Sequence, residues 1–468
     1  VVDLDGTLIR TDLLVESFLA LIKKNPLHII AVFWWLIGGK ANLKHQIAKR
    51  VDLDASALPY NVELLAYLRE QHDQGRSVVL ATASPEKYAR SIAEHIGLFE
   101  RVLASNEERN LAGAAKAQQL RDIYGADAYV YAGNARPDLA VWRSAAAAVV
   151  VDAPASLQRQ AASIVAIERI FAGPRPTLAT YLRACRIHQW IKNTLVFVPL
   201  FAAHQLANSH LLLSTVLAFF AFCLCASSVY ILNDLLDLES DRQHRKKCKR
   251  PFAAGEIPAL HGLMLIPALL CGAGMLCLAL PAWFAMVLAL YFGVTMAYSF
   301  KLKQLAMMDV MTLAGLYTLR LVGGSAASGI DLSFWLLSFS MFIFFSLAMV
   351  KRYAELEQLQ RSGRSPVAHG RGYTTSDLAL LSSLGGASGY ISVLVMALYI
   401  NNDEIQSLYT QPQLLWASCP LFLYWISRVW LITHRGEMDD DPIVFALKDQ
   451  VSRVILFLIV GVLILAAA

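Results

Sequence analysis

The sequence predicts two domains, a doubly wound α/β domain with a helical cap followed by an all-α membrane bundle of about nine transmembrane helices. Length gives the first reason, because 468 residues exceed one ordinary domain. Composition gives the second, since 56% hydrophobic residues and a mean hydropathy of +0.47 are too apolar for a soluble chain. The third is a change near residue 180, where short β-branched runs and polar stretches give way to long apolar runs.

Composition and charge exclude several other classes of protein. The 26 Gly, 16 Pro and 7 scattered Cys residues argue against a collagen-like, disordered or disulfide-stabilised chain. The formal net charge is only +5, so no nucleic-acid partner is expected. The distribution of charge along the chain is therefore more informative than its total.

Five short runs predict the strands of the α/β domain, because each is followed by a helix-forming stretch. The runs cover residues 1–5, 77–82, 102–105, 128–132 and 147–151. We expect this domain to span residues 1–172, with the helical cap inserted at about 13–75 and a Pro-rich linker at 173–180. Within the cap, residues 28–39 are apolar but too short to cross a membrane. They either form a packed cap helix or contact the bilayer or the membrane domain, and the Trp34-Trp35 pair favours contact.

Apolar stretches in the second domain predict the membrane spans. They lie near residues 192–207, 211–232, 262–280, 282–298, 307–324, 333–350, 379–400, 413–433 and 452–468. Lys and Arg are absent from the loops at 203–211, 281, 324–333 and 401–413, whereas the alternate loops at 241–250, 301–303, 351–371 and 434–435 are basic. The positive-inside rule therefore predicts a multi-pass protein of the inner or plasma membrane, with the N-terminal domain cytoplasmic, the C-terminus outside and no signal peptide.

Asp3 and Asp5 close the first predicted strand, on one side of an extended chain and at the strand end where open α/β sheets bind ligands. One carboxylate can attack phosphorus while the other moves the proton of the leaving group, provided that Mg²⁺ offsets the negative charge. Thr82 and Lys116 offer a hydroxyl and an ammonium group to a phosphate, and Asp138 follows a later strand. This combination predicts phosphoryl chemistry.

These residues resemble the haloacid dehalogenase (HAD) superfamily, whose nucleophile loop is Asp-x-Asp-x-Thr. The resemblance implies a Rossmann-like fold and one role for each residue. Asp3 would be the nucleophile, Asp5 the acid/base, Thr82 and Lys116 the phosphate-binding residues, and Asp3, Asp5 and Asp138 the Mg²⁺ ligands. Asn134 stands where the family often has aspartate, so a domain kept only for folding or docking is the alternative.

A second acidic motif ends the second predicted span. Asp234, Asp237 and Asp241 are spaced i, i+3 and i+7, which would place them on one face of a helix. Carboxylates at membrane depth point to function, and a carboxylate trio favours Mg²⁺ whose other ligands are phosphate oxygens. Donors in and after the motif that can grip these phosphates are Asn233, Arg242, Lys247 and Arg250.

Two further polar clusters fall on the same predicted side of the membrane. One follows the fourth span and continues into the fifth, and the other precedes the first span. Their candidate substrate-binding residues are Tyr298, Lys301, Lys303, Asp309 and Arg320 in the former, and Arg186, His188, Gln189, Lys192 and Asn193 in the latter.

Together these clusters resemble the UbiA superfamily of intramembrane prenyltransferases, nine-helix bundles with an Asn-Asp-x-x-Asp-x-x-x-Asp motif. The resemblance implies a transferase domain over residues 181–468. Aromatic prenyltransferases of this superfamily carry a second Asp-x-x-x-Asp motif, whereas here Asp309 is followed four residues later by Leu313. The segment from His188 to Asn193, and the Asp-Arg-x-His run ending in Arg-Pro, are instead similar to decaprenyl-phosphate phosphoribosyltransferases, although Ile187 replaces a usual proline.

The resemblance implies Mg²⁺-dependent transfer of 5-phosphoribose from 5-phosphoribosyl 1-diphosphate to a polyprenyl phosphate. The product would be polyprenyl-phosphoryl-ribose 5-phosphate, from which the HAD domain would remove the 5-phosphate. Three alternatives stay open: an aromatic prenyltransferase with a prenyl diphosphate donor, a transporter or channel, and a non-catalytic assembly protein. The expected partners are the two substrates and the lipid bilayer, while a homo-oligomer and the prenyl chain length are left undecided.

Overall fold

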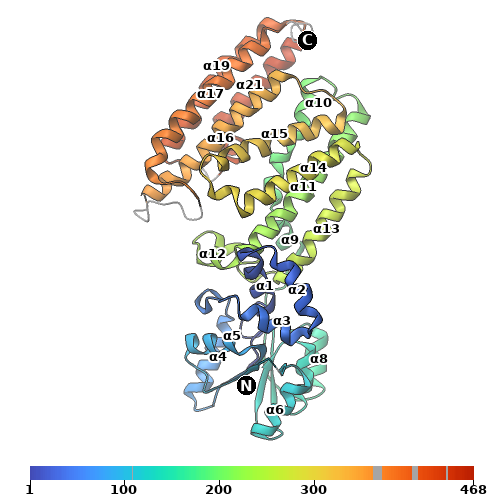
Figure 1. Cartoon of the computed structure of the whole chain (residues 1–468), viewed down its shortest axis with the longest axis vertical. Coiled ribbons are helices and arrows are strands. Elements are labelled where there is room, and N and C mark those ends of the chain that lie inside the picture. Colours follow the sequence, from blue (N-terminus) through green and yellow to red (C-terminus); the bar gives the residue numbers. More distant parts are fainter. Residues whose placement is uncertain (108, 362–370, 403–408, 439–440, 468) are drawn as a thin grey trace. The chain divides into compact units, whose positions relative to one another are not determined.

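The computed structural model describes residues 1–107, 109–361, 371–402, 409–438 and 441–467. The chain forms two compact units. The first unit comprises Val1–Cys185 and Tyr230–Pro267, and the second comprises Arg186–Val229 and Ala268–Ala468. The labels of Figure 1 are used below.

A parallel sheet forms the core of the first unit. Its strands are β1 (Val79–Pro85), β2 (Arg101–Ser105), β3 (Val130–Gly133), β4 (Ala147–Val151) and β5 (Ile167–Phe171). β1 pairs with β2, and β3, β4 and β5 form a second ladder. Val2 joins the two ladders through parallel bridges to Leu80 and Ala132. The segments therefore lie in the order β2, β1, Val2, β3, β4, β5, which is the doubly wound order 3-2-1-4-5-6 when counted along the chain.

Four of the five predicted strands have counterparts in β1 to β4. The first predicted strand, residues 1–5, is wrong as a regular strand: Val2 forms the central bridges, and the chain then folds back so that Asp5 bridges Ile9. β5 was missed because Glu168 and Arg169 interrupt its apolar pattern. β5 pairs only with β4 and is largely exposed, so it does not need the apolar run that marks a buried strand.

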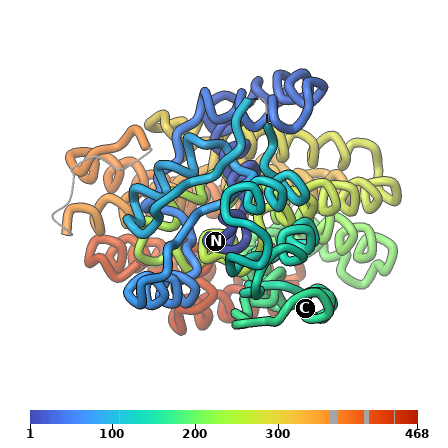
Figure 2. The backbone as a smooth tube through the Cα atoms, turned by 90° about the horizontal axis from the view of Figure 1, so that it is seen from below, coloured from blue at the N-terminus to red at the C-terminus, as the bar shows by residue number. Residues whose placement is uncertain are grey.

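Helices cover both faces of the sheet (Figure 1). They are α4 (Val62–Asp73), α5 (Glu86–Ile96), α6 (Ala114–Tyr124), α7 (Leu139–Trp142) and α8 (Ala155–Ala162). Alternate strand residues face the two layers, since Leu80 packs with α4 and α5 while Ala81 packs with α6, α7 and α8. Figure 2 shows the N-terminus between the blue helices that precede residue 100 and the teal helices that follow it.

The predicted cap range, 13–75, begins with three helices, α1 (Leu13–Lys24), α2 (His28–Ile37) and α3 (Gly39–Ala48), which are called the cap below, whereas α4 at its end packs in the core of the sheet. Asp12 begins α1 because its side chain accepts hydrogen bonds from the backbone N–H groups of Leu14 and Val15. Leu21 of α1 packs with Leu43 and Ile47 of α3 in a small core of its own. α2 contains no buried residue.

Eight helices in the described part of the chain are long and apolar enough to cross a membrane. They are α11 (Ser209–Leu236), α13 (Ala259–Cys277), α14 (Ala282–Phe300), α15 (Met308–Ser328), α16 (Phe334–Arg361), α17 (Leu378–Ile400), α19 (Ser418–His434) and α21 (Gln450–Ala467). Each matches a predicted span. The first predicted span, 192–207, is wrong, because this segment contains the end of the 3-10 helix η3 (Ile187–Phe197) and the short helix α10 (Val198–Ala202). Polar Lys192 and Asn193 occupy its start, and His204 adopts a positive φ of 55° after α10.

Candidate active sites

The first candidate site lies where the strand order of the α/β core reverses, beside Val2 between β1 and β3. Asp5 follows Val2, and its two carboxylate oxygens accept hydrogen bonds from Leu13 N at 2.8 Å and Ser84 Oγ at 2.6 Å. Burial raises the pKa of Asp5 to about 6, and the nearby Asp12 adds to the rise. A carboxyl group with this pKa can exchange a proton near neutral pH, which suits the acid/base role predicted for it.

A buried hydrogen-bond network connects Asp3 with Asp138. Lys116 Nζ donates to Asp3 Oδ1 at 2.7 Å and to Tyr131 Oη at 2.9 Å. Tyr131 in turn donates to Asp138 Oδ1 at 2.9 Å, and the other Asp138 oxygen accepts from the backbone N–H of Asn134 at 3.0 Å. Burial raises the pKa of Asp138, and the charge of Asp3 adds to it. The structure thus brings the predicted residues Asp3, Lys116 and Asp138 together through Tyr131, which the sequence did not mark.

Other predicted residues of this site lie in the same region. Thr82 is fully buried, and its hydroxyl accepts from Ser84 N at 3.0 Å. Asn134 packs over the Asp3–Asp5 loop, because a Cβ on Gly6 would lie 2.1 Å from Asn134 Nδ2. The cap contributes Lys44, whose Nζ donates to the carbonyl oxygen of Ala83 at 2.6 Å. Burial lowers the pKa of Lys44, although the nearby charges of Asp5, Asp12 and Asp3 oppose this shift. The sequence did not predict that Lys44 lies near these aspartates.

The three HAD-type carboxylates provide the hard oxygen donors that Mg²⁺ requires. In this structure, however, they bond to Lys116, Ser84, Tyr131 and backbone N–H groups. Within the described ranges, no group of three Asp, Glu, His or Cys side chains is arranged to hold a metal ion. The donor chemistry therefore fits Mg²⁺, while the metal roles of Asp3, Asp5 and Asp138 stay predictions.

The second acidic motif does not lie on one helix, so that prediction is wrong. α11 ends at Leu236, Asp237 leaves the helical region at φ −102° and ψ 14°, and α12 (Leu238–Gln243) begins after it. Asp234 and Asp241 nevertheless converge, because Arg250 Nη1 lies 3.0 Å from an oxygen of the former and 2.5 Å from an oxygen of the latter. Both carboxylates are 2% exposed. They share the Arg250 cation, and the metal role predicted for them stays a prediction.

The third carboxylate and its neighbour contact the cap. Asp237 Oδ1 lies 2.9 Å from Lys23 Nζ of α1. Arg242 makes a two-pronged ion pair with Glu16 of the same helix, at 2.9 and 2.5 Å. Arg242 was predicted to bind a diphosphate, but in this structure it is paired with Glu16. No pattern in the sequence predicted this ion pair. Of the other predicted donors of this motif, Lys247 is exposed and Asn233 is half-buried on α11.

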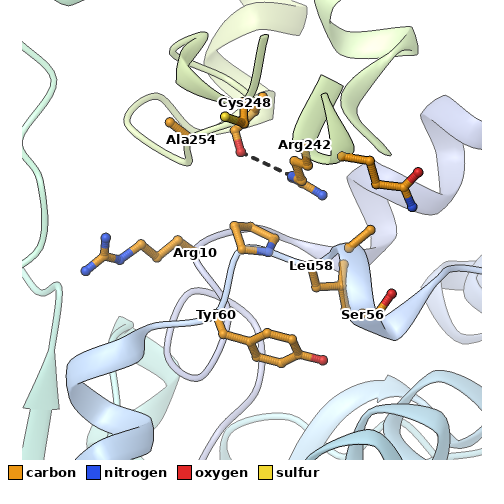
Figure 3. A pocket seen from close by; sticks show the side chains of 11 residues that line it. Arg10, Ser56, Leu58, Tyr60, Arg242, Cys248 and Ala254 are labelled. Atoms are coloured by element: carbon orange, nitrogen blue, oxygen red, sulfur yellow. Dashed lines mark hydrogen bonds between the residues drawn. The ribbon is translucent and has the colours of Figure 1, made fainter. Parts of the chain in front are cut away.

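A cavity of about 430 Å³ borders this contact. Figure 3 shows Arg242 and Cys248 on one side of it and Ser56 and Tyr60 on the other. Arg242 Nε donates to the carbonyl oxygen of Ala253 at 3.2 Å, the interaction drawn as a dashed line. Hydrogen bonds thus hold both ends of the Arg242 guanidinium group.

In the second unit, Asp309 organises a cluster of cations. The side chain of Asp309 is fully buried and accepts hydrogen bonds from Tyr298 Oη at 2.7 Å and Arg371 Nη1 at 3.1 Å. Arg352 forms an ion pair with it through Nε and also contacts Glu355. Asp309 and Tyr298 were predicted as site residues, whereas Arg352 and Arg371 were not. Their only signal in the sequence was the basic loop at 351–371, of which residues 362–370 lie outside the described residues.

Asp441 holds a neighbouring pair of lysines. Lys192 forms an ion pair with Asp441, and Lys351 Nζ lies 3.8 Å from the same carboxylate. Although burial alone would raise the pKa of Asp441, these two ammonium groups hold it below its usual range. Lys351 also interacts electrostatically with Arg352 and Arg371, so the lysines and the arginines form one basic cluster.

Two segments of the chain match known protein families. Residues 194–448, more than half of the chain, match the UbiA prenyltransferase family. The chain belongs to the UbiA prenyltransferase family. Residues 1–143 match the haloacid dehalogenase-like hydrolases. Both resemblances predicted from the sequence are thereby confirmed, and family membership together with the long apolar helices makes this a multi-pass membrane protein.

Three relatives show how the two domains are shared. A protein of Sinorhizobium fredii, described as uncharacterized protein y4nM, is 35% identical over 99% of this chain and 90% of its own length. Nodulation protein NoeC of Azorhizobium caulinodans is 35% identical over 61% of this chain and 93% of its own. Decaprenyl-phosphate phosphoribosyltransferase of Mycolicibacterium smegmatis is 31% identical over 62% of this chain and 93% of its own.

The remaining predicted residues of the UbiA domain fall into two groups. Arg320 is 4% exposed and is bonded to Asn193 Oδ1 at 2.7 Å and Tyr291 Oη at 2.9 Å, so these groups fix the packing of η3 on α15. The others lie at helix ends. Arg186, His188 and Gln189 begin η3, and Lys301 and Lys303 follow α14. Burial and the charges of Arg186 and Lys192 lower the pKa of His188, which therefore lies beside the basic cluster.

Proposed function

We propose that the membrane domain transfers 5-phosphoribose from 5-phosphoribosyl 1-diphosphate to a polyprenyl phosphate, giving polyprenyl-phosphoryl-ribose 5-phosphate and diphosphate. The observation that carries this proposal is the 31% identity to a decaprenyl-phosphate phosphoribosyltransferase along 93% of that enzyme. A likeness over nearly the whole relative is more informative than the fold alone.

The charge of the second unit supports a donor rich in phosphate. The basic cluster contains Lys192, Lys351, Arg352 and Arg371, and the carboxylates that contact it are Asp309, Asp441 and Glu355. Among the residues that the structure describes, these four cations contact three carboxylates, an excess of positive charge that favours an anionic ligand. Phosphoribosyl diphosphate carries a 5-phosphate beyond the diphosphate that a prenyl diphosphate donor also has. Asp309, which sits where an aromatic prenyltransferase would begin its second metal motif, is bonded to two arginines instead.

The acidic motif is the part of the chain that would hold Mg²⁺. Asp234, Asp237 and Asp241 are the ligands we propose, and the ion would neutralise the diphosphate leaving group. Arg250, within 3.0 Å of two of these carboxylates, can follow the leaving group as a charge-assisted donor. The acceptor phosphate is ionised at pH 7, so it needs positioning rather than a base. Lys192, Lys301 and Lys303 are the proposed holders of the two phosphomonoester groups.

We further propose that the HAD domain removes the 5-phosphate. A carboxylate oxygen of Asp3 attacks phosphorus, the ester P–O bond breaks, and Asp5 gives its proton to the departing oxygen of the ribose. Water then hydrolyses the aspartyl phosphate and releases inorganic phosphate. Lys116, 2.7 Å from Asp3, provides positive charge at the attacked group. Tethering both domains in one chain raises the effective concentration of the product at this site.

The test is to incubate the purified full chain with Mg²⁺, phosphoribosyl diphosphate and a polyprenyl phosphate, and to weigh the lipid product by mass spectrometry. We expect lipid-linked ribose from the wild type and lipid-linked ribose 5-phosphate from Asp3→Asn. If neither protein yields ribosylated lipid, whereas a prenyl diphosphate and an aromatic acceptor react, the transferase proposal is overturned. If both products retain the 5-phosphate, only the phosphatase proposal fails and the HAD domain is kept for docking.

We also propose the predicted orientation, with the HAD domain cytoplasmic and the C-terminus outside. The support is the alternation of basic loops with loops that carry no Lys or Arg. A tag after Ala468 should react with an impermeant reagent on intact cells, and one inserted at residues 362–372 should react only after lysis. The reverse labelling would contradict the orientation.

A further inference from the structure

α2 (His28–Ile37) presents an apolar surface that the described residues of the first unit leave exposed. Its neighbour Leu27 is 71% exposed, and within the helix Phe33, Trp34 and Ile37 are 67%, 71% and 78% exposed. Ile30 lies between them and is 59% exposed. Clustered apolar side chains of this size on a folded domain mark an interaction site rather than ordinary surface.

The opposite side of α2 is fixed to the cap. The half-buried residues recur at the helical spacing i, i+4 and i+7, as His28, Val32 and Trp35. Val32 and Trp35 pack against the small core of α1 and α3. Arg50 stacks over the Trp35 ring at 4.5 Å, and Asn42 Nδ2 donates to the Trp35 carbonyl oxygen at 3.0 Å. The exposed face therefore belongs to a docked helix and not to a frayed end.

The charges around α2 identify its partner. Residues 17–51 contain five Lys and one Arg but no Asp or Glu. Lys23 and Lys24 precede α2, and Lys40 follows it. An apolar helix face with tryptophan, flanked on both sides by cations, has the chemistry that binds an anionic bilayer surface. The chain brings such a surface within reach, because the described residues include eight helices long and apolar enough to cross a membrane.

We propose that α2 lies in the cytoplasmic interface of the bilayer and presents the HAD site to a phosphomonoester carried on a membrane lipid. α3 follows α2 after Gly38, and its Lys44 reaches the Ala83 carbonyl beside Thr82, so the anchor is one helix away from the site. A lipid-borne phosphate moves in the plane of the bilayer, and an anchored cap keeps the site near that plane. The choice of substrate rests on the proposed phosphatase function, whereas the anchoring does not.

Photo-crosslinking of the full chain in vesicles of phosphatidylcholine and phosphatidylglycerol tests the anchor. p-Benzoylphenylalanine replaces Trp34 in one sample and Val62 in a matched control, since Val62 is 74% exposed on α4 of the same unit. We expect a phospholipid adduct at position 34 and none at 62. Crosslinks at position 34 to a second copy of the chain or to the chain's own membrane helices would overturn the proposal, as would equal lipid labelling at both positions.

A pair of activities tests the choice of substrate. In the variant Phe33→Asp with Trp34→Asp, removal of the 5-phosphate from the lipid product should fall roughly 10-fold or more, because the local concentration of substrate is lost. Hydrolysis of free ribose 5-phosphate should not change, and Val62→Asp should alter neither rate. Equal loss of both hydrolyses would overturn the proposal, since it indicates damage to the site. If the wild type hydrolyses neither substrate, the phosphatase proposal fails, and the crosslinking result still decides the anchor.

Discussion

The HAD site and the acidic motif of the UbiA domain both depend on buried carboxylates, but they hold them differently. In the HAD site, Asp5 and Asp138 accept hydrogen bonds mainly from hydroxyl and backbone N–H groups. In the acidic motif, Asp234 and Asp241 share Arg250, and Lys23 pairs with Asp237. The first arrangement relies on hydroxyl and backbone donors, whereas the second relies on the cationic side chains of Arg250 and Lys23. The acidic motif is therefore better suited to exchanging one cation for another during a reaction.

The largest expected effect concerns the largely buried ion pair of Lys116 with Asp3 in the HAD network. Their side chains are 4% and 13% exposed, so Lys116→Met leaves a buried carboxylate without its cation. We expect the domain to lose about 3–5 kcal/mol of stability. Hydrogen exchange of β1 and β3 peptides in the full chain measures this loss without assuming two-state unfolding.

The control is Arg90→Met, which removes a pair with Glu86 whose side chains are 66% and 49% exposed. An exposed helical pair of this kind contributes about 0.3–0.5 kcal/mol. Equal protection in the two variants would show that Lys116 is not needed for stability and that backbone and hydroxyl donors alone hold the HAD carboxylates.

The next effect concerns catalysis at the acidic motif. Replacing Asp234, Asp237 or Asp241 singly by Asn should reduce phosphoribosyl transfer on the order of 10²-fold or more, the scale of losing a principal electrostatic group. A double variant should lose little beyond a single one, because in the proposed mechanism the three act on one bound diphosphate. The assay is the rate of label transfer from phosphoribosyl diphosphate to lipid. Glu239→Gln on α12 is the matched control, since Glu239 is exposed and should leave the rate unchanged.

The sequence predicted best what lies close together along the chain. The Asp3–Asp5 loop and the Asp234–Asp241 segment are short motifs of this kind. Each of the three polar clusters predicted in the UbiA domain also contributes a residue to an ion pair, namely Lys192, Asp241 and Asp309. Tyr131, Arg352 and Asp441 were missed because distant segments bring them to their partners, and no local pattern records that proximity. Arg352 in particular follows the apolar part of α16, where a cation is equally expected as a membrane anchor.

Two errors in secondary structure have a local cause as well. Hydropathy cannot distinguish a membrane span from a shorter apolar helical segment, so residues 192–207 were assigned one span although the 3-10 helix η3 passes into the short helix α10 at Val198. The i, i+3, i+7 spacing of the acidic trio assumed a helix through Asp237, where the structure has a break. In both places a predicted site residue, Lys192 or Asp237, lies in the irregular segment.

A smaller effect tests the backbone of the HAD site. Gly6 has φ +70°, and a Cβ there would lie 2.1 Å from Asn134 Nδ2. Gly6→Ala should therefore cost about 1–3 kcal/mol of domain stability, which combines an unfavourable φ with a steric clash. Asn134→Ala should recover part of this loss in the double variant, because it removes the clash and leaves the strain. Hydrogen exchange of the same peptides measures both. A double variant no more stable than Gly6→Ala would place the whole cost in the backbone.

The smallest effect decides whether the cap contributes to the acidic motif. Lys23 and Asp237 have side chains 47% and 31% exposed, and an ion pair this accessible contributes about 0–1 kcal/mol. Lys23→Met should therefore change phosphoribosyl transfer by at most about 5-fold, through the apparent affinity for Mg²⁺ and donor rather than through the maximal rate. Lys24→Met is the matched control, since Lys24 Nζ bonds to the Arg50 carbonyl and not to the motif. A loss as large as that of Asp237→Asn would mean that Lys23 itself binds the reacting phosphates. The cap of the HAD domain would then be part of the transferase site.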